Sequence, residues 1–466
     1  MVSYVTPNDT YIVGLSDSES IQNAVDYAAR EGIGRVVIPR MNERTGKAIW
    51  DIERAIILSS DIEVILDNCL LRQADGVADN VFRSHLVNED AQNVDAQLHD
   101  IRIIGRGKAV IEGGVHNGIT ESKYNKQNGR HPSLNSMILF RNVRDFVIEG
   151  ISFEHQRFWA INLGYAAYGR LSNLHFWCEA ENPNLDGIDL RSGCHDIIIE
   201  NITGQSGDDL IALSAIGAAA FDVERLRAFR FSIPGVSNDI HDITIKNVIG
   251  TSVDCAIIAL RASDGHKLYN VTIDNVHDVD NGALEAGKRY PEYPKASINM
   301  EIRRKREGNH PYALLRIGQN GFFKERANIL GEVYGITATN LYSRGGVAIM
   351  INASLKDSYF GNIHADNDVD YVVTTKSGRT KQKYGADLEN VVFENIFYNN
   401  TDNDFATAFD FDYNEENYTL KNVIVSRAFL GNCKKPFSMR QKGSLVYSEL
   451  YGKTVENKSG EIFGEE

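Results

Sequence analysis

The stretch Ile197-Ile198-Ile199-Glu200-Asn201-Ile202 decides the fold, because its pattern recurs along the chain. Apolar residues alternate up to an asparagine, and one more apolar residue follows. Copies are found at Ile243-Thr244-Ile245-Lys246-Asn247-Val248, Val271-Thr272-Ile273-Asp274-Asn275-Val276 and Val391-Val392-Phe393-Glu394-Asn395-Ile396, with a looser one at Phe146-Val147-Ile148-Glu149-Gly150-Ile151. Asn201 and Asn247 are 46 residues apart, twice the 23 between Gly150 and Asn173. A repeat of roughly 20–30 residues indicates a solenoid.

The residue types in the repeat indicate which solenoid this is. The repeated unit is β-branched and alternates with period two, whereas helical repeats need a 3.6-residue period and leucine-rich repeats need leucine at most consensus positions. Parallel coils stacked about 4.8 Å apart would align each apolar position with its copies. The recurrent asparagine suits a ladder of side-chain amides at a corner with left-handed backbone. We therefore predict an all-β fold, a parallel β-helix forming one domain over residues 1–466.

Residues 1–40 predict a cap for one end of this solenoid. Ser16 and Glu19 have the spacing of a helix N-terminal capping box, and Gly32 follows as a stop signal. The apolar residues between them fall on one helix face: Ile21, Ala24, Val25 and Ala28. Residues 35–39 then read as a first strand.

Composition excludes several classes of partner. The 466 residues are 42% hydrophobic, and 49 Lys+Arg against 63 Asp+Glu leave a net charge of −14. Nucleic-acid binding needs a basic surface, so we expect no nucleic-acid partner. Residues 1–10 have no basic start followed by an apolar run, and no window is long and apolar enough to span a membrane. We expect a cytoplasmic protein, or a secreted one whose signal has been trimmed.

The cysteines indicate the redox state and metal content that we expect of the protein, and two interruptions of the repeat indicate loops. The five cysteines are scattered without metal-site spacing, which favours reduced core thiols over disulfides or zinc, and we expect neither metal nor cofactor. Residues 281–330 and 375–385 break the repeat and are rich in basic residues. We predict a long charged insertion loop at 281–330. Either stretch is a solvated loop or a loop that grips an anionic chain.

The strongest chemical signal is a pair of aspartate motifs. Asn184-Leu185-Asp186-Gly187 is followed by Gly207-Asp208-Asp209, and Asp186 and Asp208 are 22 residues apart, about one coil. We expect Asp186 and Asp208 to lie above one another with Asp209 beside them. Mutual repulsion would raise the pKa of one carboxyl, providing the acid and base that glycoside cleavage needs. The structural alternatives are ordinary turn aspartates or a calcium site.

These motifs resemble glycoside hydrolase family 28, the polygalacturonase family. The family pattern is Asn-Thr-Asp-Gly followed by Gly-Asp-Asp, and here leucine replaces threonine. The resemblance implies a right-handed, pectin-lyase-like parallel β-helix and an inverting, cofactor-free hydrolase. It implies Asp208 as general acid, with Asp186 and Asp209 holding and deprotonating water. Carboxylates one coil apart could lie near about 5 Å, which is typical of retaining enzymes, so the stereochemistry rests on the resemblance alone.

Two family motifs that contact substrate are altered. Where the family has Gly-His-Gly, this chain has Phe229 with Arg230 beside it. The family's Arg-Ile-Lys has its nearest match at Ala259-Leu260-Arg261, and a guanidinium can hold a carboxylate at two points. These losses leave the sugar open to a different uronic acid, a rhamnogalacturonan-type linkage or a neutral glycan. Besides Asp186, Asp208 and Asp209, the candidate substrate-binding residues are Asn184, Arg230, Arg261, His266, Lys267 and Trp159.

The sequence therefore predicts a polygalacturonase-like hydrolase of pectic or related acidic oligosaccharides. A β-helix lyase, epimerase or transglycosylase is the first alternative, and it would need an arginine or lysine base and often calcium. A glycan-binding β-helix without turnover is the second, because fold alone does not imply function.

Overall fold

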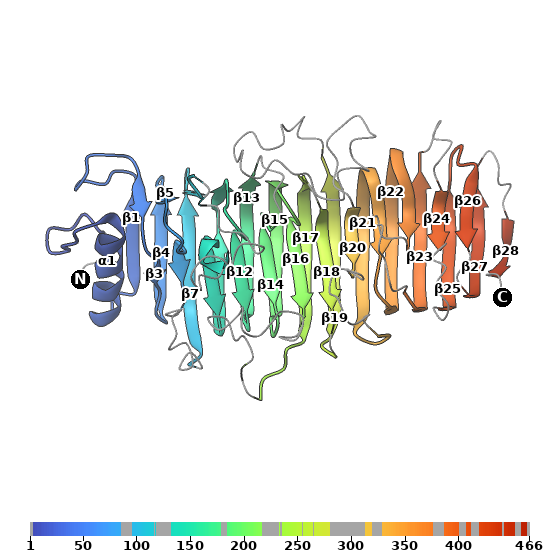
Figure 1. Ribbon diagram of the computed structural model, residues 1–466, viewed down its shortest axis with the longest axis horizontal. Helices are drawn as coiled ribbons and strands as arrows, with labels where there is room; N and C mark the ends of the chain where they lie inside the picture. The colour runs from blue at the N-terminus through green and yellow to red at the C-terminus, as the bar shows by residue number, and fades with distance from the viewer. Residues whose placement is uncertain are drawn as a thin grey trace.

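The computed structural model is an elongated stack of parallel β-strands with the N- and C-termini at opposite ends (Figure 1). The structure describes residues 3–84, 96–115, 117, 132–178, 184–216, 233, 235–253, 255–263, 265–279, 313–318, 329–375, 386–399, 407–411, 419–439, 442–452 and 458–463. Within these residues 28 strands share one continuous hydrogen-bonded sheet. The predicted parallel β-helix is confirmed.

The sheet winds through three faces, which we number for reference. Face 1 contains, in order along the axis, β3 (Ile56–Ile57), β6 (Phe82–Arg83), β9 (Ile138–Arg141), β12 (Ile161–Gly164), β14 (Ile188–Arg191), β16 (Ile211–Ala215), β18 (Ala256–Ala262), β20 (Ala313–Ile317), the C-terminal parts of β21 (Val333–Ile351) and β22 (Leu355–Thr374), β24 (Thr407–Phe411) and β26 (Lys435–Met439). Face 1 carries the aspartate motifs.

Faces 2 and 3 complete each coil. Face 2 contains β1 (Arg35–Pro39), β4 (Ile62–Asp67), β7 (Leu98–Arg106), β10 (Val143–Glu149), β13 (Ala167–Trp177), β15 (His195–Ser206), β17 (Ile240–Ser252), β19 (Leu268–Asp278), β21, β22, β23 (Leu388–Tyr398), β25 (Thr419–Phe429) and β27 (Lys442–Tyr451), with β28 (Lys458–Phe463) added antiparallel. Face 3 begins with β2 (Trp50–Ile52), β5 (Leu70–Gln73), β8 (Val110–Glu112) and β11 (Ser152–Glu154) and continues in the C-terminal part of β13. A 3-10 turn covers Pro132–Asn135.

The repeated asparagine marks the corner between faces 2 and 3. Asn201, Asn247 and Asn275 have φ values of 56°, 56° and 59°, in the left-handed region that asparagine tolerates. Asn247 Nδ2 donates to Asn201 Oδ1 at 3.0 Å, and Asn275 Nδ2 donates to Asn247 Oδ1 at 2.9 Å. The predicted amide ladder is confirmed, so each coil turns at the same place.

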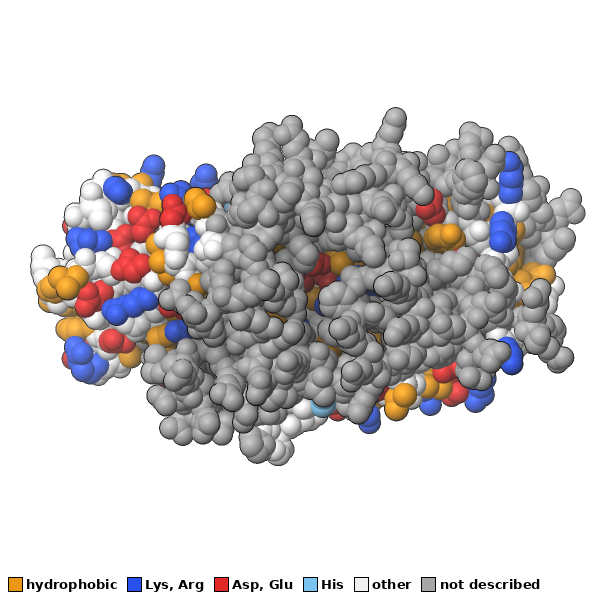
Figure 2. Space-filling view, viewed as in Figure 1, with side chains coloured by type: hydrophobic (Ala, Val, Ile, Leu, Met, Phe, Trp, Pro, Cys, Tyr) orange, Lys and Arg blue, Asp and Glu red, His pale blue; other side chains and the backbone are white. Residues whose placement is uncertain are grey.

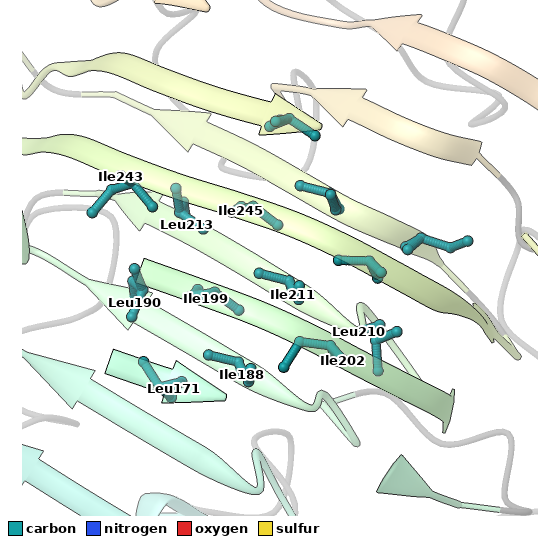
Figure 3. Packing of buried hydrophobic residues seen from close by; sticks show 14 of the residues in the cluster. Leu171, Ile188, Leu190, Ile199, Ile202, Leu210, Ile211, Leu213, Ile243 and Ile245 are labelled. Atoms are coloured by element: carbon teal, nitrogen blue, oxygen red, sulfur yellow. The ribbon is translucent and has the colours of Figure 1, made fainter. Parts of the chain in front are cut away.

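The inward positions of the repeat build one continuous core. Equivalent residues of successive coils stack along the axis, for example Leu190 with Leu213 and Ile199 with Ile245 (Figure 3). All five cysteines are described and buried, and none is in a disulfide. No helix in the described residues is long and apolar enough to cross a membrane.

The helix α1 (Asp17–Arg30) covers the N-terminal end of this core (Figure 1). Ser16 is its N-cap, and the Ser16 hydroxyl accepts a hydrogen bond from the Glu19 N–H at 3.2 Å. The helix buries its predicted apolar face, Ile21, Ala24, Val25 and Ala28. The helix and the first strand are therefore confirmed as predicted.

One predicted loop contains a strand. β20 lies within the range 281–330, for which the sequence predicted a long insertion loop, and it pairs with β18 and β21. It was missed because residues 313–317 are a short apolar run without the repeat's asparagine. Residues 280–312 and 319–328, and residues 376–385 of the second basic stretch, lie outside the described part of the chain.

Candidate active site

The site lies on the outward side of face 1, where two rows of side chains run along the axis. In the first row Trp159, Asp186, Asp209, Ala256 and Ala313 lie at equivalent positions of consecutive coils. In the second row, three residues further along each strand, the equivalents are Asn162, Asp189, Ala212, Ala259 and Arg316. The intervening positions point inward, where Ile188, Ile211 and Ile258 join the core.

The first row corrects the predicted register. Ile188 pairs with Ile211, so Asp186 lies level with Asp209 rather than with Asp208. The Gly187 N–H donates to the Asp209 carbonyl at 3.0 Å, in agreement with this alignment. The coil has 23 residues here, so the prediction that used the 22-residue spacing is wrong by one position. The three aspartates are nevertheless brought together.

Asp209 is the anchor of the site. It is 0% exposed, and its two carboxylate oxygens accept hydrogen bonds from Arg316 Nη2 at 3.0 and 2.9 Å. Asp209 Oδ2 also pairs with Arg261, and Oδ1 accepts the Ala256 N–H at 3.0 Å. Two guanidiniums on one buried carboxylate keep Asp209 ionised.

Asp208 lies beside this anchor but is partly exposed. Its Oδ2 accepts the Asn184 N–H at 2.8 Å, and its Oδ1 accepts the Asp209 N–H at 3.0 Å. The Ser206 and Ser252 hydroxyls donate to its carbonyl oxygen at 2.6 and 2.7 Å. Asn184 has φ 65°, so the backbone turns there to present its N–H to Asp208. The backbone of Asn184 thus contacts Asp208 directly.

Asp186 is a buried carboxyl whose charged form is disfavoured by its surroundings. It is 3% exposed, and its Oδ1 has no hydrogen-bond partner. Burial, followed by the neighbouring Asp189 and Asp208, raises the pKa of Asp186 well above its ordinary value. Gln156 Nε2 donates to the Asp186 carbonyl at 3.3 Å, so the backbone is held while the carboxyl is left unpaired.

Asp189 is a fourth buried carboxyl that sequence reasoning did not select. It is 0% exposed, and burial raises its pKa to about 8, although Arg191 and Arg261 oppose the shift. Burial therefore favours the protonated form of Asp189 over its charged form. Its signal in the sequence was the outward position three residues after Asp186, in the same motif.

The positive charge of the site comes from two arginines. Arg261 and Arg316 bring two positive charges, and Asp209 offsets one of them. Burial lowers the pKa of Arg261 to about 10, so it stays charged at neutral pH. Asp186, Asp208 and Asp189 act in the opposite direction, because their negative charges raise the pKa of Arg261.

Arg316 is the main functional candidate that the sequence analysis missed. It is 3% exposed, and it reaches Asp209 across a sequence separation of 107 residues. Its signal was available, since Arg316-Ile317-Gly318 keeps the first two residues of Arg-Ile-Lys. The nearest match proposed from sequence, Arg261, lies one coil earlier on β18 and also contacts Ser214 Oγ at 3.2 Å.

The other predicted residues divide into near and distant groups. Trp159 lies level with Asp186, and the Arg191 guanidinium carbon is 4.6 Å from its ring centroid. His266 and Lys267 lie beyond the end of β18, and within the described residues neither side chain forms a hydrogen bond or ion pair with the three aspartates. Arg230, with Phe229, lies outside the described residues.

A divalent metal fits this cluster poorly. Oxygens of Asp208 and Asp209 and the Cys255 sulfur lie within 4.8 Å of one another. Asp209 already faces two guanidiniums, and Arg316 Nη1 lies 3.1 Å from the Cys255 sulfur. A further cation would be repelled by these two guanidiniums.

The surface around the site is only partly described. Figure 2 shows one face of the molecule, with acidic and hydrophobic side chains visible in a narrow opening near its middle. The N-terminal end of the same view carries interspersed acidic and basic side chains.

Comparisons with known proteins agree with this reading of the fold. Residues 75–223 match the family model for glycosyl hydrolases family 28, a range that includes all three aspartates, so the resemblance seen in the sequence is confirmed there. No curated protein matches the chain in sequence.

Solved structures similar to this chain share its fold at low identity. A hyperthermoactive exopolygalacturonase from Thermotoga maritima is 14% identical, with a TM-score of 0.53, covering 99% of this chain and 94% of that one. A tailspike protein of E. coli bacteriophage HK620, in complex with a pentasaccharide, is 14% identical at TM-score 0.53, covering 97% and 76%. PfbA, a surface adhesin of Streptococcus pneumoniae, is 13% identical at TM-score 0.50, covering 96% and 91%.

Proposed function

We propose that this protein is a glycoside hydrolase that cleaves pectic or related acidic oligosaccharides by acid–base catalysis with inversion. The observation that carries the proposal is the convergence of Asp186, Asp208 and Asp209 with Arg261 and Arg316 on one side of face 1. Carboxyls of unequal proton affinity supply the acid and the base, and the guanidiniums supply the positive charge that an acidic sugar needs. The family match over residues 75–223 supports the same chemistry.

We divide the roles among the carboxyls in part as the family resemblance implies. Asp208, the more exposed of Asp186 and Asp208, donates its proton to the leaving oxygen as the glycosidic bond breaks. Asp186 in its ionised form takes a proton from the water that attacks the anomeric carbon, and its raised pKa makes that carboxylate the stronger base. One proton has moved from Asp208 to Asp186, and exchange with solvent restores the starting state. Asp209 holds the two arginines in place throughout.

This division modifies one role that the resemblance implied. Asp209 was expected to help deprotonate the water, yet both of its oxygens accept hydrogen bonds from a guanidinium. A carboxylate so engaged is a weak base. We therefore assign proton removal to Asp186 and assign to Asp209 the positioning of Arg261 and Arg316.

A lyase is the second candidate, and one observation favours it. The pKa of Arg261 is lowered to about 10, by burial first and by Arg316 second, and lyases on this scaffold require a basic arginine or lysine. Both arginines are committed to Asp209, however, which makes hydrolysis the better supported reaction.

One experiment separates these reactions. The protein is incubated with oligogalacturonides, rhamnogalacturonan fragments and neutral glycans, while reducing ends and unsaturated-uronide absorbance are followed together. New reducing ends without absorbance support hydrolysis, whereas absorbance indicates a lyase. Asp208→Asn is expected to lower kcat by at least about a thousandfold without changing the fold. Silence on both channels, or full activity of Asp208→Asn, would contradict the proposal.

A further inference from the structure

Cys255 differs from the other cysteines in its surroundings. Cys69, Cys194 and Cys433 pack into the hydrophobic core, as the sequence predicts for all five thiols. Cys255 is 4% exposed but lies outside that core, directly before β18. Its sulfur accepts a hydrogen bond from Arg316 Nη1 at 3.1 Å. This thiol therefore belongs to the charged site.

The backbone of Cys255 is tied to the proposed acid as well. The Cys255 N–H donates to Ser252 Oγ at 2.8 Å, and the Ser252 hydroxyl donates to the Asp208 carbonyl at 2.7 Å. The Cys255 sulfur and one carboxylate oxygen each of Asp208 and Asp209 lie within 4.8 Å of one another. The sulfur is thus held next to both carboxylates.

Arg316 divides its two terminal nitrogens between Asp209 and Cys255. Nη2 donates to both oxygens of Asp209, at 3.0 and 2.9 Å, and Nη1 donates to the sulfur. In the described part of the chain Arg316 forms no ion pair with Asp208, although Asp208 adjoins Asp209. β18 pairs with β16 on one side and with β20 on the other. The coil of Cys255 therefore lies between the coils of Asp208 and Arg316.

This arrangement matters because an acid must be protonated before it can donate. A guanidinium in contact with a carboxyl favours the ionised form, which cannot donate. A thiol is only a weak acceptor and is uncharged when protonated, so it can occupy Nη1 without neutralising Arg316.

The other charged groups around Asp208 leave Arg316 as the cation whose placement Cys255 controls. They come from its own coil and from both neighbouring coils: Asp186, Asp189, Asp209 and Arg261. The carboxylates favour the protonated form of Asp208, and Arg261 opposes them. Arg261 is itself paired with Asp209 and donates to Ser214 Oγ at 3.2 Å, without contacting Cys255.

We propose that Cys255 is a positioning residue, whose sulfur holds Nη1 of Arg316 and keeps this guanidinium away from Asp208. Arg316 then serves Asp209 and an acidic sugar, while Asp208 stays available as the acid. The inference rests on the proposed function and deepens it. A serine at position 255 would keep an acceptor for Nη1. An alanine would not, so Nη1 would turn toward Asp208, whose carboxylate lies beside the vacated position.

The first test is the pH dependence of kcat/KM on a cleaved oligosaccharide. We expect Cys255→Ala to move the high-pH limb of the profile to lower pH by about one unit or more, because the acid ionises more readily beside a guanidinium. Cys255→Ser should keep the limb in its wild-type place. Cys69→Ala, at a core thiol, is the control: it should lower Tm through lost packing without moving the limb. An unmoved limb for Cys255→Ala, or an equal shift for Cys255→Ser, overturns the inference.

Thermal unfolding gives a second readout that needs no substrate. Asp208→Asn should lower Tm more in the Cys255→Ala background than in the wild type, because it then also breaks the new contact with Arg316. Additive changes in Tm would overturn the inference. Non-additive changes in a protein that cleaves none of the glycans would refute the proposed function and leave the positioning of Arg316 standing. Cleavage combined with additive changes and an unmoved limb would do the reverse.

Discussion

Asp209 carries one negative charge and contacts two positively charged guanidiniums. Replacing Asp209 should therefore lower the stability of the folded protein. Arg261 and Arg316 both contact it in a buried environment. Removing one partner of a buried ion pair leaves an uncompensated charge, which costs about 3–5 kcal/mol. At the scale of single residues, the ion pairs of Asp209 should therefore stabilise the fold as well as position the arginines of the site.

We expect Asp209→Asn to lower the free energy of unfolding by about 3–5 kcal/mol, because two guanidiniums would then face each other without a carboxylate. Urea denaturation measures the change. Asp208→Asn is the matched control: Asp208 accepts two backbone hydrogen bonds and forms no ion pair with the described residues, so this variant should lose about 1 kcal/mol. Equal losses for the two variants would show that the arginines are not anchored by Asp209.

The buried Asp189 predicts a dependence of stability on pH. Its pKa is raised to about 8 in the folded protein, above the ordinary value of 3.8. Between these values the folded state binds more protons than the unfolded state, so this group's contribution to stability falls as pH rises from about 4 to about 8. Asp189→Asn cannot ionise. Its free energy of unfolding relative to wild type should therefore increase steadily over this range, and a constant difference would contradict the assignment.

At the scale of the structural element, the asparagine corner is the repeated device. Asn247 combines a φ of 56° with two amide hydrogen bonds, to Asn201 and Asn275. The left-handed backbone disfavours residues with a Cβ, and the amide bonds join coils that are far apart in sequence. Each corner therefore contributes both to the turn and to the stacking.

Substitution of Asn247 can separate these two contributions. Asn247→Gly keeps the backbone conformation and loses the amide bonds, so it should cost about 1 kcal/mol. Asn247→Ala loses both, and should cost about 2–3 kcal/mol. Thermal unfolding of the two variants measures the difference. If alanine were tolerated as well as glycine, the backbone argument would fail.

The other element that matters for the site is β20. It contributes Arg316 to the second row, although the surrounding stretch of sequence lacks the repeat. Its inward residues Leu315 and Ile317 stack on Ile258 and Leu260 of β18. The core thus selects the register that brings Arg316 to Asp209.

At the scale of the whole molecule, a solenoid needs its ends covered, and α1 covers the first coil. Ala24 is buried against the core and Ala29 is exposed on the same helix. We expect Ala24→Asp to lower the free energy of unfolding by several kcal/mol, of order 3–5 for an unpaired buried charge, and to expose the strand edge to self-association. Ala29→Asp is the control and should change it by less than about 0.5 kcal/mol. Light scattering and thermal unfolding measure both effects, and similar behaviour of the two variants would contradict the capping role.

Much of the architecture could be predicted from short patterns in the sequence, each within a single coil or helix. The period-two alternation and the asparagine copies predicted the parallel β-helix, and Ser16 and Glu19 predicted the capping helix. Both succeed because inward burial and left-handed corners are properties of each coil by itself. The aspartate motifs likewise predicted which carboxyls would gather, because they occur about one coil apart.

Only the tertiary structure decided which side chains face each other across coils. It aligned Asp186 with Asp209, left the side chains of Asn162 and Asp189 without hydrogen-bond partners, and brought Arg316 to a carboxylate 107 residues earlier. These contacts depend on the hydrogen-bond register between stacked strands, which is independent of the length of the segments that connect them. A sequence records each coil's own alternation of inward and outward residues, whereas the charges that meet in the site belong to different coils.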